Sequence, residues 1–405
     1  MERLRRITLE DAIFYALVVF AIGSCISGHL GTNAEKVALA LCAIRLLRGN
    51  IPFERLRVAK NLAIVLVIFF GTMTISAFWS GDFWGAVSFF SPMKWAFEEL
   101  LIFCVILCAD REKRVGILWG AMFLSLFAVE LNMIYDLGKG IFRPAGFLKA
   151  ILPTSTLYTI LLPPLAIFSL DADSGNKRQI ACKGMMILGL AAVVAIGTRG
   201  IWLALLLTLP IVVYCRCGWK RSFRIVAACL ALVVAVSMFL PDIRDRVNPE
   251  MLKHSDSISA RIAMYEGVRK MFIDRPFLGV GMANFGEYWS LQYCPPDYPA
   301  WKQYTHPHNS FLNFLVSGGI VGFVGFWAVF GFLLWWSWRR RHTRRGLLLF
   351  GSTLSLLLYA LTDTPLGSHE GMRVYWLTVG LAFAEEANML EEQKPGFGHE
   401  KHSVD

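Results

Sequence analysis

Long uncharged apolar runs recur along this sequence, and they constrain its fold more than any other feature. Residues 62–78 and 225–240 are two of about a dozen such runs, each close to the roughly 20 residues that cross a ~30 Å hydrocarbon core. Because 56% of the residues are hydrophobic and only 17% are charged, a soluble fold would leave too much apolar surface in water. The sequence therefore predicts an all-α, polytopic membrane protein.

The apolar runs predict about twelve transmembrane helices. We expect these spans at residues 9–29, 34–47, 61–79, 95–109, 115–135, 151–170, 183–198, 200–215, 223–240, 308–338, 346–362 and 372–387. This organisation gives helices 1–9 in residues 1–240, a large loop subdomain in 241–307, helices 10–12 in 308–387 and a tail in 388–405. An even number of spans puts both chain ends on the same side of the membrane.

The basic residues indicate which side that is. Loops on the side of the N-terminus carry 25 of the 40 Lys and Arg residues, and eight of the other 15 lie in the long loop 241–307. Short cytoplasmic loops are enriched in Lys and Arg, whereas long loops translocate largely regardless of charge. Both termini are therefore expected in the cytoplasm, and the net charge of +10 reflects this bias rather than a nucleic-acid partner.

Loop 241–307 is polar but rich in aromatic residues, so we expect a small folded subdomain on the outer side rather than a disordered segment. Residues 257–274 predict an amphipathic helix that Pro276 ends. Arg261 and Arg269 fall on the same arc as its apolar residues, which are Ile258, Ile262, Tyr265, Val268 and Phe272. Because a guanidinium on an apolar face is costly unless it meets an anion, Arg261 is predicted to bind phosphate in a cavity. The alternative, above all for Arg269, is contact with lipid headgroups.

A second candidate is the motif His306-Pro307-His308-Asn309 at the start of the expected span 308–338. A helical wheel places His308 on one face with the small residues Gly319 and Gly322, so we expect its imidazole to point inward. His306 precedes the proline and is the weaker candidate of the two histidines. The alternative for His308 is a helix cap or a residue that faces lipid headgroups.

A third candidate is Arg199, in the break Thr198-Arg199-Gly200 between two apolar runs at the outer surface. A tight turn that leads into a helix would add backbone N–H donors to this charge, which suits an anion. The alternative is an arginine that only anchors the membrane interface. Smaller outer loops add further basic residues as candidate anion contacts, each weak alone: Lys94, Lys139, Arg143, Lys149 and Arg373.

These candidates predict a glycosyl transfer from a polyprenyl diphosphate on the outer side of the membrane. Guanidinium groups form charge-assisted contacts with phosphate and would neutralise a diphosphate leaving group. A histidine would accept the proton of an attacking hydroxyl. The outer aspartates, Asp363 among them, are scattered along the sequence without metal-ligand spacing, so no metal site is predicted.

The same residues carry a resemblance to a known family. The segment from Arg261 through 274–281 to 306–312 resembles the shared core of bacterial O-antigen ligases and polymerases. His308-Asn309, nine further residues and Gly319-Ile320-Val321-Gly322 look like the ligase pattern His-[Asn/Ser/Gln]-X9-Gly-X-X-Gly, which is fairly specific. Arg199-Gly200-Ile201-Trp202-Leu203 looks like the family's Arg-X3-Leu element, which is weak by itself. The strong resemblance covers roughly residues 185–325.

The resemblance implies an inverting, metal-independent glycosyltransferase of the GT-C type in the bacterial inner membrane. It would transfer O-antigen from undecaprenyl diphosphate to lipid A–core at the periplasmic face, in lipopolysaccharide biosynthesis. Arg199, Arg261 and Arg269 would hold the diphosphate, and His308 would activate the acceptor hydroxyl. His306, Asn309, Gly319 and Gly322 would support this site, and no cofactor would be needed.

Other functions fit parts of the pattern. An O-antigen or exopolysaccharide polymerase of the same superfamily shares the histidine-containing loop, but two large outer loops would be expected in a polymerase. A protein O-glycosyltransferase is usually a longer chain. A transporter or flippase would need ionisable residues near the middle of the membrane, for which Glu98, Glu99 and Glu130 are candidates. Broken helices in corresponding halves, typical of transporters, are not evident in the sequence.

Overall fold

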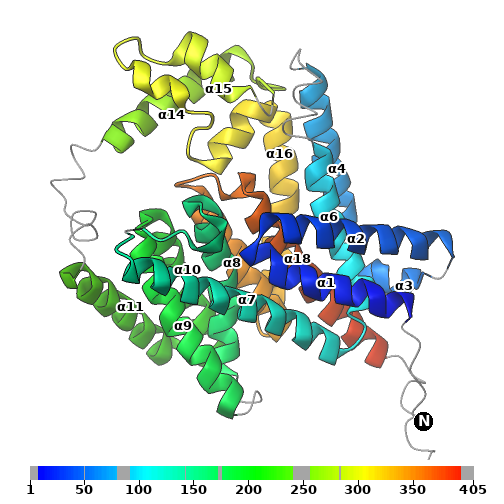
Figure 1. Ribbon diagram of the computed structural model, residues 1–405. Coiled ribbons are helices and arrows are strands. Elements are labelled where there is room, and N and C mark those ends of the chain that lie inside the picture. The colour runs from blue at the N-terminus through cyan, green and yellow to red at the C-terminus, as the bar shows by residue number, and fades with distance from the viewer. Residues whose placement is uncertain are drawn as a thin grey trace, which may run out of the picture.

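The computed structural model describes residues 8–49, 51–79, 92–141, 143–171, 176–239, 256–281 and 284–393, and every regular element in these residues is a helix (Figure 1). The longer helices are α1 Leu9–Ile26, α2 Gly28–Leu47, α4 Lys60–Trp79, α6 Pro92–Cys108, α7 Glu112–Gly138, α8 Ile151–Leu170, α9 Asn176–Ile196, α10 Arg199–Cys217, α11 Trp219–Phe239, α14 Asp256–Asp274, α16 Ser310–Arg339, α17 Arg344–Ala360 and α18 His369–Glu392. Shorter segments are α3 Phe53–Leu56, η1 Arg57–Ala59, η2 Gly146–Leu148, α15 Phe285–Tyr288, η4 Trp289–Tyr293, η5 Pro299–Gln303 and η6 Pro365–Gly367.

Each of the twelve expected spans overlaps one of the longer helices. Seven segments are long and apolar enough to cross a membrane by length and composition: Leu9–Ile26, Phe53–Ser76, Glu112–Gly138, Ile151–Leu170, Lys177–Ile196, Arg199–Cys217 and Ser310–Arg339. The described part of the chain is therefore an all-helical protein with several candidate membrane spans, while the number twelve stays a prediction. The basic N-terminal residues, residues 240–255 of the long loop and most of the tail lie outside the described residues.

Helix α8 lies at the centre of the molecule, where it packs against α9, α10, α17 and α18. A helix that is apolar around its whole circumference is stable only when other helices surround it. Some of the polar side chains in α8 bond to its own backbone, as Thr156 does to the carbonyl of Leu152 (2.7 Å) and Thr159 to that of Ser155 (2.7 Å). Because α8 packs against α10 and α17, it supports the ends of these two helices.

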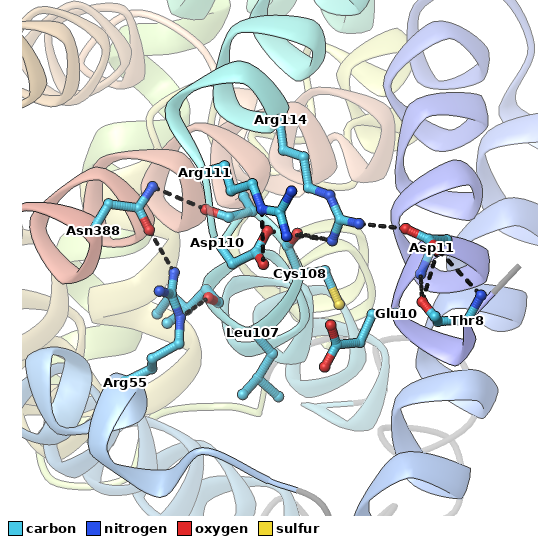
Figure 2. Close-up of polar contacts among 12 residues, drawn as sticks. Thr8, Glu10, Asp11, Arg55, Leu107, Cys108, Asp110, Arg111, Arg114 and Asn388 are labelled. Atoms are coloured by element: carbon cyan, nitrogen blue, oxygen red, sulfur yellow. Dashed lines mark hydrogen bonds and ion pairs between the residues drawn. The ribbon is translucent and has the colours of Figure 1, made fainter. Parts of the chain in front are cut away.

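Arginines hold the helix ends together at the end of the molecule where α1 begins and α18 ends (Figure 2). Arg55 donates to the carbonyl of Ile106 (3.0 Å) and to the side chain of Asn388 (2.7 Å). Arg114 donates to the carbonyl of Cys108 (3.0 Å) and pairs with Asp11. Both arginines belong to the predicted cytoplasmic set, and the structure gives them a packing role between helices in addition to their charge.

Helix α16 is broken at Gly319, which has φ 59° and ψ −160° inside an otherwise regular helix. The loop before it fills the gap, because the N–H groups of Val280 and Gly281 donate to the carbonyls of Val316 and Ser317 (both 2.9 Å). A backbone group left unpaired in a membrane would cost several kcal/mol. The loop therefore pairs the two carbonyl groups that the break in α16 leaves without an intrahelical partner. The sequence analysis did not predict this break, which is a single one and not a pair in corresponding halves of the described residues.

Glycines allow this close approach. A Cβ atom added at Gly319 would lie 2.3 Å from the backbone carbonyl of Phe277, and one added at Gly279 would lie 2.4 Å from the carbonyl oxygen of Val316. Both residues also have positive φ, which only glycine adopts at little cost. On the next turns of α16, Gly322 packs against Met73 of α4, as expected for a small-residue helix contact.

Residues 256–304 surround a second hydrophobic cluster, at the end of the molecule where α14 and α15 lie (Figure 1). Its buried members on α14 are Ala260, Met264, Val268 and Met271, and Phe285 and Trp289 pack against them. The predicted apolar arc of α14 is therefore wrong, since Ile262 is 65% exposed. Gly267 lets Trp289 lie directly on the helix backbone, since an added Cβ would be 2.7 Å from its ring, and this contact outweighs the larger side chains on the other face.

Candidate active site

The start of α16 and the end of α17 are joined by a set of hydrogen bonds. Asn309 caps α16 by accepting from the N–H of Leu312 (3.1 Å), and its amide donates to the carbonyl of Leu361 (2.9 Å). The N–H of Ser310 donates to the carbonyl of Asp363 (3.1 Å). The segment 306–310 is thereby fixed against the segment 361–364, which connects α17 to η6. We call this pair of segments the junction.

His308 lies at the centre of the junction. Its Nδ1 is 3.3 Å from Oδ1 of Asp363, and the hydroxyl of Tyr359 donates to the other oxygen of that carboxylate at 3.3 Å. The residue precedes α16 and does not belong to it, so the helical-wheel argument that placed it on the face of Gly319 is wrong. Its φ of 49° is unusual for a residue with a side chain and shows that the surrounding bonds impose its conformation.

The electrostatics of the junction favour a charged Asp363 beside a neutral His306. Burial alone raises the pKa of Asp363, but the hydrogen bonds from His308 and the Thr364 N–H, with the positive charge of Arg261, hold this pKa below its usual value. Burial, together with the nearby His308, lowers the pKa of His306 to about 4. A charged carboxylate at Nδ1 of His308 favours the tautomer that is protonated there, which makes Nε2 the basic nitrogen.

The charge of Arg261, on α14, acts at the junction. It is one of the causes that hold the pKa of Asp363 down, so the guanidinium lies within electrostatic range of the carboxylate that contacts His308. The buried neighbour Ala260 packs α14 into the second hydrophobic cluster, and the broken α16 supports that cluster through Val316. The position of Arg261 therefore depends on the fold of the loop subdomain, and its role in phosphate binding stays a prediction.

The turn that carries Arg199, at the start of α10, lies against the same end of α17. The next residue, Gly200, lies so close to α17 that an added Cβ would be 2.0 Å from Oγ1 of Thr362 and 3.1 Å from the ring of Tyr359. The preceding Thr198 contacts Ser155 of α8 through their hydroxyls (3.5 Å). The structure thus brings the segments of Arg199, Arg261 and His308, which are far apart in the sequence, to one end of α17.

Arg269 does not join them. It lies about 12 Å further along α14 and pairs with Glu266 through two hydrogen bonds of 2.8 and 2.6 Å. Its side chain is 60% exposed.

The other outer cations have separate places. Arg143 donates to the carbonyl of Ile196 (3.1 Å), close to the turn that carries Arg199. Lys139 lies over the ring of Tyr135 at 4.2 Å. Arg373 is buried in an ion pair with Glu35 (2.8 Å). Lys149 follows η2 in a left-handed conformation, and the side chain of Lys94 lies outside the described residues.

Sequence reasoning missed Asp363 as a partner of His308, together with Tyr359, Thr364 and Ser155. Asp363 was counted as one of several scattered acids, because its distance of 55 residues from His308 hides the contact. A usable signal was present: Asp363 ends an expected span on the same outer side as the histidine. In the residues that the structure describes, no three His, Cys, Asp or Glu side chains are grouped as metal ligands.

Comparison with known protein families identifies one match. Residues 184–327 match the family described as O-Antigen ligase. This region contains Arg199, Arg261, His308 and the broken part of α16, whereas Asp363 lies outside it. No curated protein matches the sequence.

Proposed function

We propose that this chain, whose residues 184–327 match the O-antigen ligase family, transfers a glycan from undecaprenyl diphosphate to lipid A–core. The observation that carries this proposal is the meeting of His308, Asp363, Arg261 and the Arg199 turn at one end of α17. One proton acceptor next to two guanidinium groups is what a glycosyl transfer with a diphosphate leaving group requires.

The proposed reaction is a single displacement. The acceptor hydroxyl gives its proton to Nε2 of His308 as its oxygen attacks the anomeric carbon of the donor sugar. The bond between that carbon and the diphosphate oxygen breaks, and the diphosphate leaves with the electron pair. Arg199 and Arg261 stabilise the charge that develops on it, while Asp363 stabilises the imidazolium that forms. Attack from the face opposite the leaving group inverts the anomeric configuration.

The proposal includes the surroundings of the site. The enzyme lies in the bacterial inner membrane with both termini in the cytoplasm, and the junction faces the periplasm. This sidedness rests on the distribution of Lys and Arg between short loops. The GT-C type is proposed from the resemblance to the O-antigen ligase family, and the all-helical architecture is consistent with it. The reaction needs no metal ion, because the guanidinium groups supply the positive charge.

A transporter is the candidate of another class, and the break in α16 is the observation that favours it. Broken helices in transporters expose backbone groups that bind an ion or a substrate. In α16, however, Val280 and Gly281 use the freed carbonyls of Val316 and Ser317, and Ser76 also donates to that of Ser317 (2.9 Å). The break therefore anchors the loop subdomain.

Reconstitution of the purified protein with a lipid-linked glycan and lipid A–core tests the proposed function. We expect the glycan to become attached to the core, in the presence of excess chelator as well as in its absence. Elongation of the lipid-linked glycan would instead identify a polymerase. Activity that a chelator abolishes and a divalent ion restores would contradict the metal-free mechanism, and release of the glycan into the vesicle lumen without a new bond would identify a transporter.

A further inference from the structure

A groove between α2 and α6, separate from the junction, has the features of a lipid site. Its volume is about 780 Å³. One wall is a single face of α2, on which residues 32, 35, 36, 39, 40, 42, 43 and 46 follow one another at helical spacing. The other wall is α6, with Leu100, Phe103, Cys104 and Leu107.

The groove has the length and the access that a lipid chain requires. From Thr32 to Leu46 it follows α2 for roughly 21 Å, which is longer than one leaflet, about half of a ~30 Å hydrocarbon core. Leu46 and Leu100 on its walls are 53% and 45% exposed, so the groove opens sideways toward the bilayer. Apart from its charged end, it is lined by aliphatic, aromatic and cysteine side chains, which suit an acyl chain.

Charged side chains occupy one end of the groove. Arg373 of α18 lies 2.8 Å from a carboxylate oxygen of Glu35 and 3.6 Å from Oε1 of Glu98. His369 lies 2.8 Å from the same oxygen of Glu98. These ion pairs hold α2, α6 and α18 together, which gives the cluster a structural role. Among the described residues, Oε2 of Glu98 has no hydrogen-bond partner, although Glu98 is only 2% exposed and lines the groove.

This end of the groove is on the same side of the molecule as the junction. His369 begins α18 directly after η6, and η6 follows Asp363. The start of α2 also lies there, since a Cβ added at Gly28 would be 3.3 Å from Oε1 of Glu370 in the first turn of α18. A lipid in the groove would therefore place its headgroup in the leaflet that contains the candidate active site.

We infer that the groove binds an aminophospholipid, with its ammonium group on Glu98 and an acyl chain along α2. Oε2 of Glu98 accepts no hydrogen bond from the described residues, and a buried carboxylate oxygen in a membrane is costly unless a donor joins it. An ammonium group supplies the N–H donor that this oxygen lacks. Lys36, exposed at the edge of the groove, is placed to meet the phosphate of the same headgroup.

The charge of the site argues against the glycan donor as its occupant. A polyprenyl diphosphate has an apolar chain of suitable kind, but its head carries only negative charge. Such a head has no N–H donor for Oε2 of Glu98, which it would meet at the charged end of the groove, and the two negative groups would repel each other. The inference is thus independent of the proposed function, because it concerns a structural lipid of the surrounding bilayer.

Lipid exchange on the full-length protein tests this inference. The protein in detergent is titrated with phosphatidylethanolamine, phosphatidylcholine or phosphatidylglycerol, and bound lipid is measured by native mass spectrometry. We expect phosphatidylethanolamine to bind about tenfold more tightly than the other two, the change that the loss of one charge-assisted hydrogen bond produces. Equal binding of all three lipids, or preference for phosphatidylglycerol, would overturn the assignment, as would displacement of the bound lipid by a polyprenyl diphosphate.

Two pairs of variants locate the binding. Glu98→Gln should remove the preference for phosphatidylethanolamine, whereas Glu130→Gln, also a buried carboxyl without a hydrogen-bond partner but outside the groove, should keep it. Ala43→Phe should fill the groove and lower the occupancy of every lipid, whereas Ile44→Phe at the neighbouring exposed position should not. Ala43→Phe leaves the ion pairs intact, so it decides the question even if Glu98→Gln fails to fold. Unchanged lipid binding in Ala43→Phe would overturn the proposal.

Discussion

Oδ1 of Asp363 lies 3.3 Å from Nδ1 of His308, although the two residues are 55 positions apart. Tyr359 and the N–H of Thr364 also donate to this carboxylate, so its orientation is fixed from three sides. The contact directs one imidazole nitrogen toward the protein and leaves the other for a reacting group. An aspartate that orients a histidine in this way is a recurrent arrangement in enzymes that use histidine as a base.

Asp363→Asn should lower kcat by about 100-fold with little change in KM for either substrate. The amide retains the size of the carboxylate but no longer favours the reactive tautomer of His308, a loss that belongs to general-base catalysis. Glycan transfer by purified variants measures this change. Asp297→Asn, on an exposed part of the loop subdomain, is the matched control and should behave like the natural sequence. A KM effect without a change in kcat would show that Asp363 acts in binding instead.

Arg261 and Arg269 lie on the same helix and should differ in their effect on the donor. Arg261→Ala should weaken the donor interaction by about 10- to 100-fold, because a hydrogen bond to a charged group contributes about 1.5–3 kcal/mol. Arg269→Ala should change it by less than about fivefold, since this side chain is exposed, pairs with Glu266 and lies about 12 Å along the helix from Arg261. Donor titrations in the transfer assay measure both. Equal losses in the two variants would refute the different roles that the geometry gives them.

The break in α16 predicts unequal effects of two alanine substitutions in that helix. Gly319→Ala should lower the free energy of unfolding by at least about 2 kcal/mol, because it introduces a side chain at positive φ against the carbonyl of Phe277. Gly331→Ala should be neutral or stabilising by up to about 1 kcal/mol, since its nearest neighbour would be 3.7 Å away in a regular turn. Unfolding in detergent compares them. A Gly319→Ala protein as stable as Gly331→Ala would show that the break is not required.

His306 should make the protein less stable in acid. The unfolded histidine takes up a proton near pH 6.5, but burial holds the pKa in the folded state at about 4. Between these values the unfolded chain binds more protons, so stability falls as the pH falls through this window and is unaffected above it. His306→Gln should therefore lose less of its Tm between pH 7 and pH 4 than the natural sequence. Parallel Tm curves for the two proteins would contradict this assignment.

The helical framework was readable from the sequence because hydrophobicity along the chain decides where helices can cross a membrane. The predicted ends of the helices were less accurate where a helix begins with polar residues. The second span was expected from residue 34, but α2 begins at Gly28 because Ser27 caps it by accepting from the N–H of Leu30 (3.4 Å). Such caps extend helices into polar segments that hydropathy assigns to loops.

The site was predictable only in part. Arg261 and the histidine motif could be identified because charged and polar residues beside apolar segments need a reason to be there. The contact between His308 and Asp363 could not, because it depends on how α16 and α17 meet. The buried face of α14 also depends on tertiary packing. Trp289 packs against Gly267, and this contact, not the size of the apolar residues, decides which face of the helix is buried.

We propose His308 as the proton acceptor of the glycan transfer, and one measurement tests this role most directly. Glycan transfer to lipid A–core is followed in liposomes that contain either the natural protein or His308→Ala, with equal amounts of inserted protein. His308→Ala should show no transfer above background while it still binds the lipid-linked donor, because Arg199 and Arg261 remain. Transfer at the natural rate in His308→Ala would contradict the proposed chemistry of the junction.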